Sequence, residues 1–539
     1  MATNYLHPGI YIQEVPSART IQGASTSTPA FVGITQTLAT SPIGQPTLIT
    51  SWNAYQRTFG NMVWNGMVSW AVYQFFALGG ALCYVLRAPD ASGAAKNATA
   101  AAGTVSLTAA TPGEWPNTVL GVMITNSSGD PKATSPVFNL SIVADPAELN
   151  KAPGSTLAAY VTQNGLGPQT LGTGNKQLIV LESYNGYTAN SLQALVAAVN
   201  ATSMFVTATT PDTKTPARPG NTSSAVAFKG GVSQTIDYAK TLALLNTVQD
   251  IGLLSMPDTV NAIDASKAPS IMAQSTAINA GLNYCEQQAS LFYVSDPPFN
   301  LSPQDMLGFR MGSGTGAMAS QALNSTFGSI YYPWVWVSNP ILGSNVPIPP
   351  SGPVLGRYAN TDSSVGVWKS PAGVIDGALK TVVMTQTPLT DSDQDVLNPE
   401  GIDAIRNLIG YGNVIYGART LAAVGSEWTY VAVRRLFIYV EQSLKQSLQW
   451  VVFEPNDQTT WSAVTRDIDA FLTTLWQAGG LFGASAAEAF FVVCDASNNP
   501  PETRALGQMY IDIGLAPVYP AEFVIIRIAQ KTAGPDSGS

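Results

Sequence analysis

The chain has 539 residues, of which 45% are hydrophobic, so it is long enough for about two to four domains with substantial cores. Charged residues make up only 11%, against about 25% in typical soluble proteins, which suggests that other protein covers much of the surface. The net charge is −9, and no basic run exceeds the pair Arg434–Arg435. The sequence therefore lacks the clustered Lys and Arg residues with which a nucleic-acid-binding protein neutralises phosphates.

The first predicted element is a short strand in the stretch "NYLHPGIYIQEVPS", from Asn4 to Ser17. Residues Gly9–Val15 are typical of a strand, and Pro8 and Pro16 bracket it. The backbone groups of a strand need partners, but the Ser/Thr/Gly-rich stretch that follows has no turn that would fold a second strand back. We therefore interpret residues 1–30 as an extended arm and linker.

Residues 31–89 alternate strand-like and helix-like segments, which is typical of an α/β sheet. Within them, the apolar window Ala71–Leu86 is broken by Gln74 and by Gly79–Gly80. We interpret this window as a helix, a glycine stop and a buried strand rather than as a membrane span, so no membrane insertion is expected.

The composition changes at about Asp90. From residue 90 to residue 229, small and polar residues separate short strand-like runs such as "TVSLTA", "TVLGVMIT", "FNLSIV" and "KQLIVLES". This pattern predicts a mostly-β domain inserted into the α/β one.

The α/β pattern resumes at residue 230. Residues 230–420 are expected to form a middle α/β domain, in which the Pro/Gly-rich stretch 339–357 is predicted to be a loop. Residues 421–522 are expected to form a C-terminal α/β domain with a helix at "RRLFIYVEQSLKQSLQW", a strand at "AFFVVCD" and a helix over Trp461–Ala478. Residues 523–539 are interpreted as a terminal strand and tail.

Few residue patterns support catalysis. His7 is the only histidine and the three cysteines are widely separated, so neither a Ser-His-Asp triad nor a zinc site is expected. "GPQTLGT" (Gly167–Thr173) lacks the P-loop lysine, and "GSGTGA" (Gly312–Ala317) follows no clear strand, as a dinucleotide fingerprint would. We expect no catalytic residue, no metal and no cofactor. A glycosidase with paired carboxylates stays open, because such pairs form in space rather than in sequence.

Several segments, taken in their order along the chain, resemble the tail sheath proteins of contractile-tailed bacteriophages and related contractile injection systems. They are "YLHPGIYIQEVPSARTIQGASTSTPAFVG", "ALGGALCYVLRA", "YYPWVWV", "PPSGPVLGRYANTDSSVGVWKSPAG", "LNPEGIDAIR", "YGARTL", "RRLFIYVEQSL", "WVVFEPND", "TWSAV" and "PAEFVIIRIAQ". Residues 90–229 match weakly apart from "GEWPNTVLGVMI". The resemblance implies a multidomain α/β fold whose core combines N-terminal and C-terminal parts, with an outward-facing insertion at residues 90–229.

The resemblance implies a structural subunit rather than an enzyme. Such subunits stack as hexameric rings around an inner tail tube, and their contraction drives the tube through the host envelope with energy stored in a metastable lattice. The implied partners are other copies of this chain, the inner tail tube protein, and baseplate and tail terminator proteins, with no nucleic acid. The implied location is the tail sheath of a virion, assembled in the cytoplasm of a host bacterium.

The resemblance also suggests what the terminal strands pair with. In this family both arms leave their own subunit and complete a sheet in neighbours by strand addition. The residues expected to exchange are Gly9, Ile10, Tyr11, Ile12, Gln13, Glu14 and Val15 in the N-terminal arm, and Phe523, Val524, Ile525, Ile526, Arg527 and Ile528 in the C-terminal arm. The linker "SARTIQGASTST" is expected to act as a flexing tether.

Contact with the inner tube is expected from a helix of the C-terminal domain, as in this family. The candidates are Arg466, Asp467 and Asp469, which we place near the solvent side of helix Trp461–Ala478. The alternative is an ordinary surface helix with solvated charges.

Other classes of protein remain open on the sequence. Another lattice protein, such as a tail tube or surface-layer subunit, would also be charge-poor, but a tube subunit is normally smaller and a surface-layer protein should carry an export signal. A carbohydrate-active enzyme would need the insertion to bind sugar, and a host-surface binding module is a further alternative for the insertion. Phage, bacteriocin particle and secretion-type injector are not separated, although one chain holding all domains favours the first two.

Overall fold

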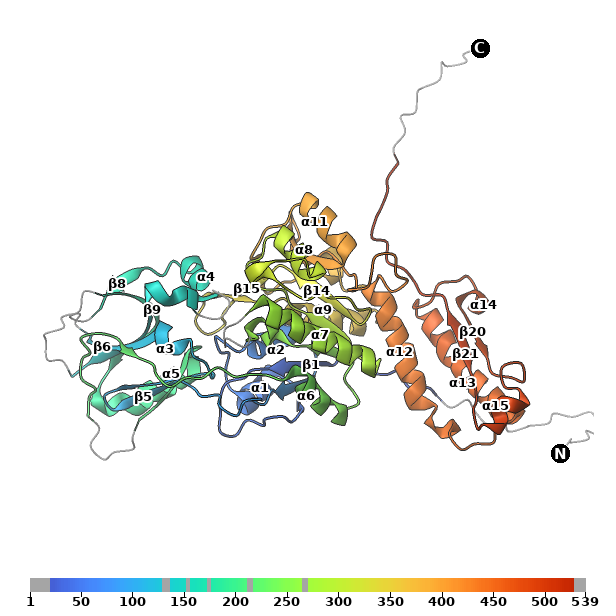
Figure 1. Cartoon of the computed structure of the whole chain (residues 1–539), viewed down its shortest axis with the longest axis horizontal. Coiled ribbons are helices and arrows are strands. Elements are labelled where there is room, and N and C mark those ends of the chain that lie inside the picture. Colours follow the sequence, from blue (N-terminus) through green and yellow to red (C-terminus); the bar gives the residue numbers. More distant parts are fainter. Residues whose placement is uncertain are drawn as a thin grey trace, which may run out of the picture.

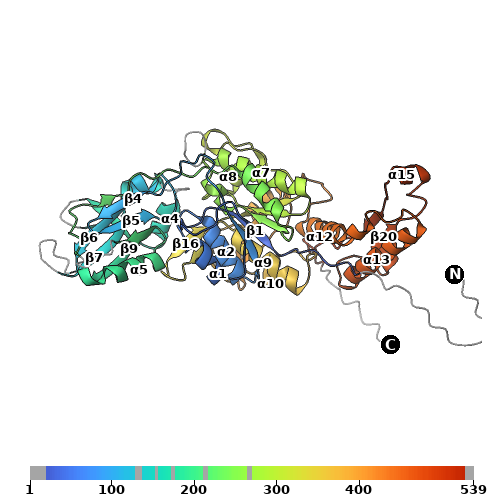
Figure 2. The ribbon, with the colours of Figure 1, turned by 90° about the horizontal axis from the view of Figure 1, so that it is seen from below.

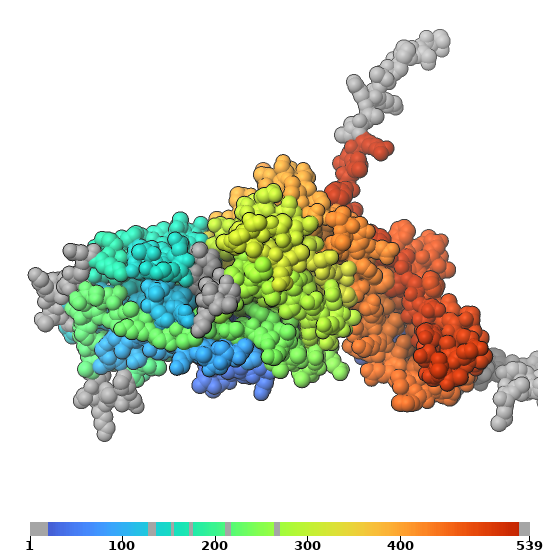
Figure 3. All heavy atoms as spheres, in the orientation of Figure 1, coloured from blue at the N-terminus to red at the C-terminus, as the bar shows by residue number. Residues whose placement is uncertain are grey.

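The computed structural model describes residues 20–127, 136–151, 156–171, 176–210, 217–263 and 270–527. The described chain is elongated and has three parts along its long axis (Figures 1 and 3). The insertion lies at one end, an α/β core lies in the middle, and the C-terminal domain lies at the other end, an order that Figure 2 shows from below. The multidomain α/β fold predicted from the sequence is confirmed.

An eight-stranded sheet forms the centre of the core. Its inner strands run parallel, and the two edge strands run antiparallel to their neighbours. The N-terminal strand β1 pairs with β12, so segments before and after the insertion share one sheet. In sheet order the strands are β19 (Gly412–Ile415), β18 (Ile402–Leu408), β14 (Gly328–Tyr332), β13 (Phe292–Ser295), β12 (Leu253–Ser255), β1 (Pro29–Gly33), β3 (Cys83–Arg87) and β2 (Thr47–Ile49).

Helices cover both faces of this sheet. In β1, Phe31 belongs to the apolar cluster on one face, and Ala30 and Val32 belong to the cluster on the other, as expected for a parallel sheet buried on both sides. The first face is covered by α1 (Trp52–Phe59), α2 (Met67–Ala77) and α9 (Ser351–Ser364), and the second by α6 (Tyr238–Ala243), α7 (Ile271–Gln288), α8 (Pro303–Met311) and α11 (Asp391–Leu397).

The apolar window Ala71–Leu86 forms the end of α2, a turn at Gly79 and most of β3, as predicted. A search of the described residues finds no helix with the length and apolarity needed to cross a membrane.

The stretch 339–357 is not a loop, contrary to the prediction. It contains β16 (Asn345–Ile348) and the first half of α9. Pro353 lies in the first turn of α9, where its missing N–H breaks no helical hydrogen bond. Gly352 is a packing residue, since a Cβ there would lie 2.4 Å from the Cα of Ala71 in α2. Proline and glycine, taken as loop formers, here begin a helix and let two helices approach closely.

The remaining elements of the core are short. Strand β15 pairs with both β16 and β17 in a small antiparallel sheet. These elements are β15 (Val335–Ser338), β17 (Val382–Thr385) and α10 (Gly373–Asp376).

The insertion contains two antiparallel sheets, in the orders β10-β5-β4 and β11-β6-β7-β9-β8. None of these strands pairs with the eight-stranded sheet in the part of the chain that is described. Its core continues into the α/β core, because Trp64 packs against Tyr160 and Phe205. The strands are β4 (Thr99–Ala102), β5 (Val105–Ala109), β6 (Leu120–Asn126), β7 (Phe138–Ala144), β8 (Pro168–Thr170), β9 (Gln177–Tyr187), β10 (Val206–Thr209) and β11 (Val226–Ala227), and the helices are α3 (Pro116–Val119), α4 (Thr156–Gln163) and α5 (Leu192–Thr202).

The C-terminal domain is built on two long helices, α12 (Val431–Ser447) and α13 (Gln458–Gln477), close to the positions predicted. One face of α13 carries Val464, Ile468 and Leu472 into a small apolar cluster that also receives Leu436 and Val440 of α12. The remaining elements are α14 (Ala486–Ala489), β20 (Phe490–Val493), α15 (Pro501–Ala505) and β21 (Asp512–Leu515), of which β21 was not predicted.

A buried ion pair joins the C-terminal domain to the core. Asp362 in α9 and Arg435 in α12 are linked by two hydrogen bonds of 3.0 and 2.5 Å, and their side chains are 2% and 3% exposed. The same guanidinium donates to the carbonyl of Thr26 at 3.0 Å and lies 4.7 Å from the ring centre of Tyr358. The pair therefore ties α9, α12 and the N-terminal linker together.

Candidate assembly surfaces

Two carboxylates lie where an open α/β sheet usually binds its ligand, just after the carboxyl ends of β12 and β13. Asp258 accepts hydrogen bonds from the backbone of Ile34 and Met67, each at 2.7 Å. Asp296 accepts from the backbone and the hydroxyl of Ser351 at 2.8 and 2.6 Å. Both are buried at the first turns of helices α2 and α9, which favour negative charge. They hold helix ends in place and are not open to a sugar.

Burial raises the pKa of Asp296 to about 7 and that of Asp258 to about 6, against the hydrogen bonds that they accept. These two carboxyl groups therefore bind more protons in the folded chain than in the unfolded chain between about pH 4 and pH 7. We expect urea unfolding to show stability that falls as the pH rises through this window. Asp296→Asn should flatten this fall, whereas the exposed Asp250→Asn should leave it unchanged. An equal slope in Asp296→Asn would contradict the assignment.

The glycine-rich motifs do not form nucleotide sites in the described residues. Gly312–Ala317 follows helix α8 rather than a strand, and Gly312 ends that helix in the left-handed conformation. Gly167 precedes β8, and Thr173 lies outside the described residues. The three cysteines are buried free thiols. No group of three or more His, Cys, Asp or Glu side chains in the described ranges could hold a metal ion.

The C-terminal arm leaves the body of the molecule beside α12 (Figure 1). Residues 523–527 form no strand with the described part of the chain. The four consecutive apolar side chains Phe523–Ile526 are 72–80% exposed. Exposing so much apolar surface to water is unfavourable in free energy compared with burying it against protein. The rest of the predicted exchange strand, Ile528, lies outside the described residues.

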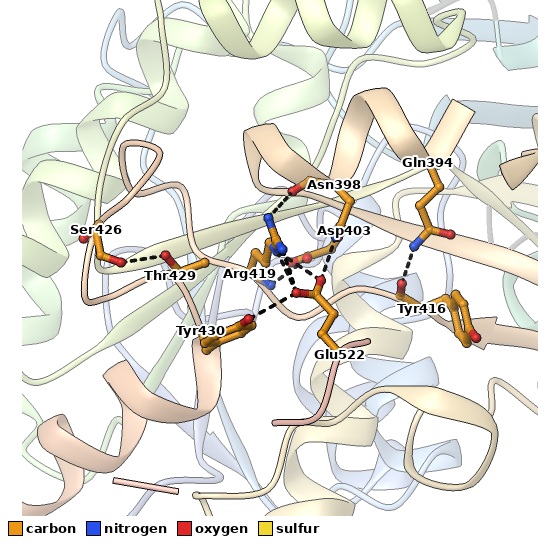
Figure 4. Close-up of polar contacts among 9 residues, drawn as sticks. All are labelled: Gln394, Asn398, Asp403, Tyr416, Arg419, Ser426, Thr429, Tyr430 and Glu522. Atoms are coloured by element: carbon orange, nitrogen blue, oxygen red, sulfur yellow. Dashed lines mark hydrogen bonds and ion pairs between the residues drawn. The ribbon is translucent and has the colours of Figure 1, made fainter. Parts of the chain in front are cut away.

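Directly before this exposed run, Glu522 is clamped to the core (Figure 4). Its carboxylate accepts two parallel hydrogen bonds from Arg419, at 3.0 Å from Nε and 2.6 Å from Nη2. Asn398 donates to it at 2.6 Å, and the hydroxyl of Tyr430 at 3.3 Å. The two ionic side chains are 15% and 20% exposed, so water screens the pair only in part.

The electrostatics of the clamp favour the ionised pair. Burial alone would raise the pKa of Glu522, but the hydrogen bonds from Arg419 and Asn398 outweigh it and hold this pKa below its ordinary value. The backbone N–H of Arg419 donates to Asp403 of β18 at 2.7 Å. Burial raises the pKa of Asp403 well above its ordinary value. The clamp thus connects the arm to the central sheet.

The N-terminal linker is attached to the opposite end of α12. The hydroxyls of Ser447 and Ser443 accept hydrogen bonds from the backbone of Gln22 and Ala24, at 3.2 and 2.9 Å. Ile21 is buried in the apolar cluster of the C-terminal domain. From residue 20 onward the linker is therefore held on a helix, which differs from the flexing tether expected. The predicted arm strand, Gly9–Val15, lies outside the described residues.

The C-terminal domain presents a narrow sheet of two strands, and just past the end of β21 Pro517 forms an isolated bridge with Leu481. β20 and β21 pair only with each other among the described strands. Their inner residues Phe490, Val492, Ile513 and Leu515 pack on the apolar cluster but are only half-buried. A sheet of two strands is marginal by itself, and further strands would cover these side chains.

The candidate tube-contact residues lie on two different sides of α13. Arg466 is exposed, and Asp469 is half-buried, with a pKa that burial raises. Asp467 is buried, contrary to the prediction that it lies near solvent, and its side chain is 1% exposed. The physical reason is helical spacing, because Asp467 follows Val464 by three residues and so shares the apolar face.

Comparison with known proteins first finds a match at the C-terminal end of the chain. Residues 423–531 match the family model of the phage tail sheath C-terminal domain. The tail sheath protein of Vibrio phage KVP40 is 30% identical over 189 residues, which span 35% of this chain and 27% of that protein. The tail sheath protein of Burkholderia phage BcepMu is 25% identical over 307 residues, which span 54% of this chain and 62% of that protein.

The fold as a whole also has a counterpart among solved structures. A cryo-EM structure of the anti-feeding prophage helical sheath in the contracted state covers 97% of this chain and 99% of its own, with a TM-score of 0.56 and 24% identity. These similarities define a multidomain protein with the fold of contractile sheath subunits. Residues 423–531 are similar to the phage tail sheath C-terminal domain, and the resemblance to tail sheath proteins found in the sequence is confirmed.

Proposed function

We propose that this chain is the structural subunit of a contractile tail sheath, which stacks as hexameric rings around an inner tube and drives that tube through the host envelope. The observation that carries the proposal is the exposed apolar run Phe523–Ile526, anchored at its base by Glu522. An apolar arm held ready outside its own body is suited to pairing with another copy of the chain.

The exchange of arms is supported by the narrow β20–β21 sheet, which has only two strands among the described residues. One edge would receive Gly9–Val15 of one neighbour, and the other would receive Phe523–Ile528 of a second. About six ladder bonds would contribute roughly 0.5–1.5 kcal/mol each, whereas ordering each residue costs roughly 1–2 kcal/mol. A single arm is therefore near balance, and burial of its apolar side chains together with several simultaneous contacts makes the lattice stable.

Contraction would use energy stored in the lattice. The extended sheath is a metastable packing and the contracted sheath a deeper minimum, reached when rigid subunits rotate while their exchanged arms stay paired. The protein acts as a structural component rather than as an enzyme, which the buried, helix-capping roles of Asp258 and Asp296 support.

The partners follow from this role. They are other copies of the chain, the inner tail tube protein, and baseplate and tail terminator proteins, in a virion tail assembled in the host cytoplasm. For the tube contact we retain the accessible residues Arg466 and Asp469. The insertion at one end of the molecule would face outward (Figure 3).

Negative-stain electron microscopy of three purified proteins tests the proposal. The full chain should form long hollow tubes, because each subunit can give and receive two arms. Variants lacking residues 1–17 or residues 523–539 should remain dispersed at the same concentration. Tubes of the same width from either truncated chain would contradict arm exchange, and a full chain that stays dispersed would contradict spontaneous assembly.

A further inference from the structure

The bases of the two terminal arms lie at opposite ends of one helix. Tyr430, which contacts Glu522 at the base of the C-terminal arm, is the residue directly before α12. The linker to the N-terminal arm is bound at the other end, by Ser443 and Ser447 in the last turns of α12. At about 1.5 Å per residue, the 17 residues of α12 separate the two bases by about 25 Å.

Helix α12 is suited to act as a rigid element. It has no Gly or Pro in its interior, and most of its first three turns is buried. Arg435 fixes it to the core through Asp362, and the guanidinium of Arg434 lies between the rings of Phe327 and Trp428, at 3.8 and 4.6 Å from their centres. The helix is thus attached to the core and to the C-terminal domain at once.

We propose that α12 is a strut that carries both arm anchors, and that Arg419 and Glu522 are the positioning residues that fix where the C-terminal arm begins. This inference rests on the proposed exchange of arms between subunits. A pull on one arm would then pass along α12 to the other, so that neighbouring subunits are coupled through a single helix.

The clamp sets the free length of the C-terminal arm. Three residues before Glu522 in the chain, Tyr519 packs edge-on against Tyr430, the residue directly before α12, with ring centres 6.2 Å apart. Release of Glu522 would add three residues of free chain, which is about 10 Å of slack. With this longer free arm, neighbouring subunits could shift against each other without the arm transmitting force to α12.

Distance measurements between spin labels test the clamp in the full chain, kept below the concentration at which it assembles into tubes. One label is placed at Val524→Cys in the arm and the other at Ala470→Cys, an exposed position on α13. The three native cysteines are buried, so labelling is confined to the introduced sites. We expect a narrow distance distribution, which Glu522→Gln and Arg419→Gln each widen by up to about 10 Å.

The charge-swapped variant Arg419→Glu with Glu522→Arg should restore the narrow distribution, which a general loss of folding would not allow. Glu502→Gln, an exposed position in α15, is the matched control and should change nothing. A broad distribution in the parent chain, or an unchanged one in both single variants, would overturn the clamp.

In assembled samples, the single clamp variants should still form tubes, because their arm strands are intact, but with a less regular helical repeat. Tubes as well ordered as those of the parent would overturn the strut. Absence of tubes from the parent chain would instead count against the proposed function, while the label distances on dispersed chains would still decide the clamp.

Discussion

Replacing Asp362 by Asn should destabilise the protein by about 3–5 kcal/mol, because it leaves the Arg435 guanidinium buried without its counter-charge. Both side chains are nearly inaccessible to solvent, so water does not compensate for the lost partner. The guanidinium keeps its bond to the carbonyl of Thr26, which is too weak an acceptor to replace a carboxylate. Urea unfolding measures the change as a lower transition midpoint.

Two comparisons make this prediction specific. The double variant Asp362→Asn with Arg435→Met should lose less stability than either single variant, because no buried charge remains unpaired. Lys240→Gln removes an exposed ion pair with Asp237 and should cost no more than about 0.5 kcal/mol. If Asp362→Asn costs as little as Lys240→Gln, then the pair does not join the core to the C-terminal domain.

Charge in the C-terminal arm should abolish assembly without affecting the isolated chain. Ile525 and Ile526 are about four-fifths exposed, so Ile525→Asp and Ile526→Asp should leave the melting temperature unchanged. In the exchanged strand that we propose, these adjacent residues would face opposite sides of the sheet, and one of them would face α13 of the neighbour. A carboxylate buried there costs about 3 kcal/mol per subunit, which raises the critical concentration about 100-fold.

Sedimentation of polymer at a series of protein concentrations measures this effect. The variant whose residue faces α13 should give no polymer at concentrations where the parent assembles fully, and the other variant should be less affected. Ile525→Val keeps an apolar strand residue and should assemble like the parent. If both Asp variants polymerised as readily as the parent, the arm would not be buried in the lattice.

Periodic apolar patterns predicted much of this fold. The spacing of Val464, Ile468 and Leu472 was sufficient to place α13, and the short apolar runs correctly indicated buried strands of an α/β sheet. The same spacing, applied to Asp467, would have placed that residue on the buried face. The loop prediction for the stretch 339–357 was wrong because glycine and proline occur both in loops and in helices, where proline fits the first turn and glycine allows close packing. Only the contact with α2 shows that Gly352 is a packing residue.

The clamp had no signal in the sequence. Arg419 and Glu522 are 103 positions apart, and each is an ordinary charged residue in its own stretch. Likewise, Ser443 and Ser447 read as polar positions of a helix, and only the folded chain shows that their hydroxyls hold the linker at Gln22 and Ala24. Long-range polar contacts of this kind depend on the tertiary fold, which local patterns do not encode.

The exchange of arms is tested most directly by a cryo-EM reconstruction of tubes assembled from the full chain. We expect the β20–β21 sheet of each subunit to gain two strands from two other copies, Gly9–Val15 along one edge and Phe523–Ile528 along the other. Density that shows both arms packed on their own subunit, with the β20–β21 sheet still two-stranded, would contradict it.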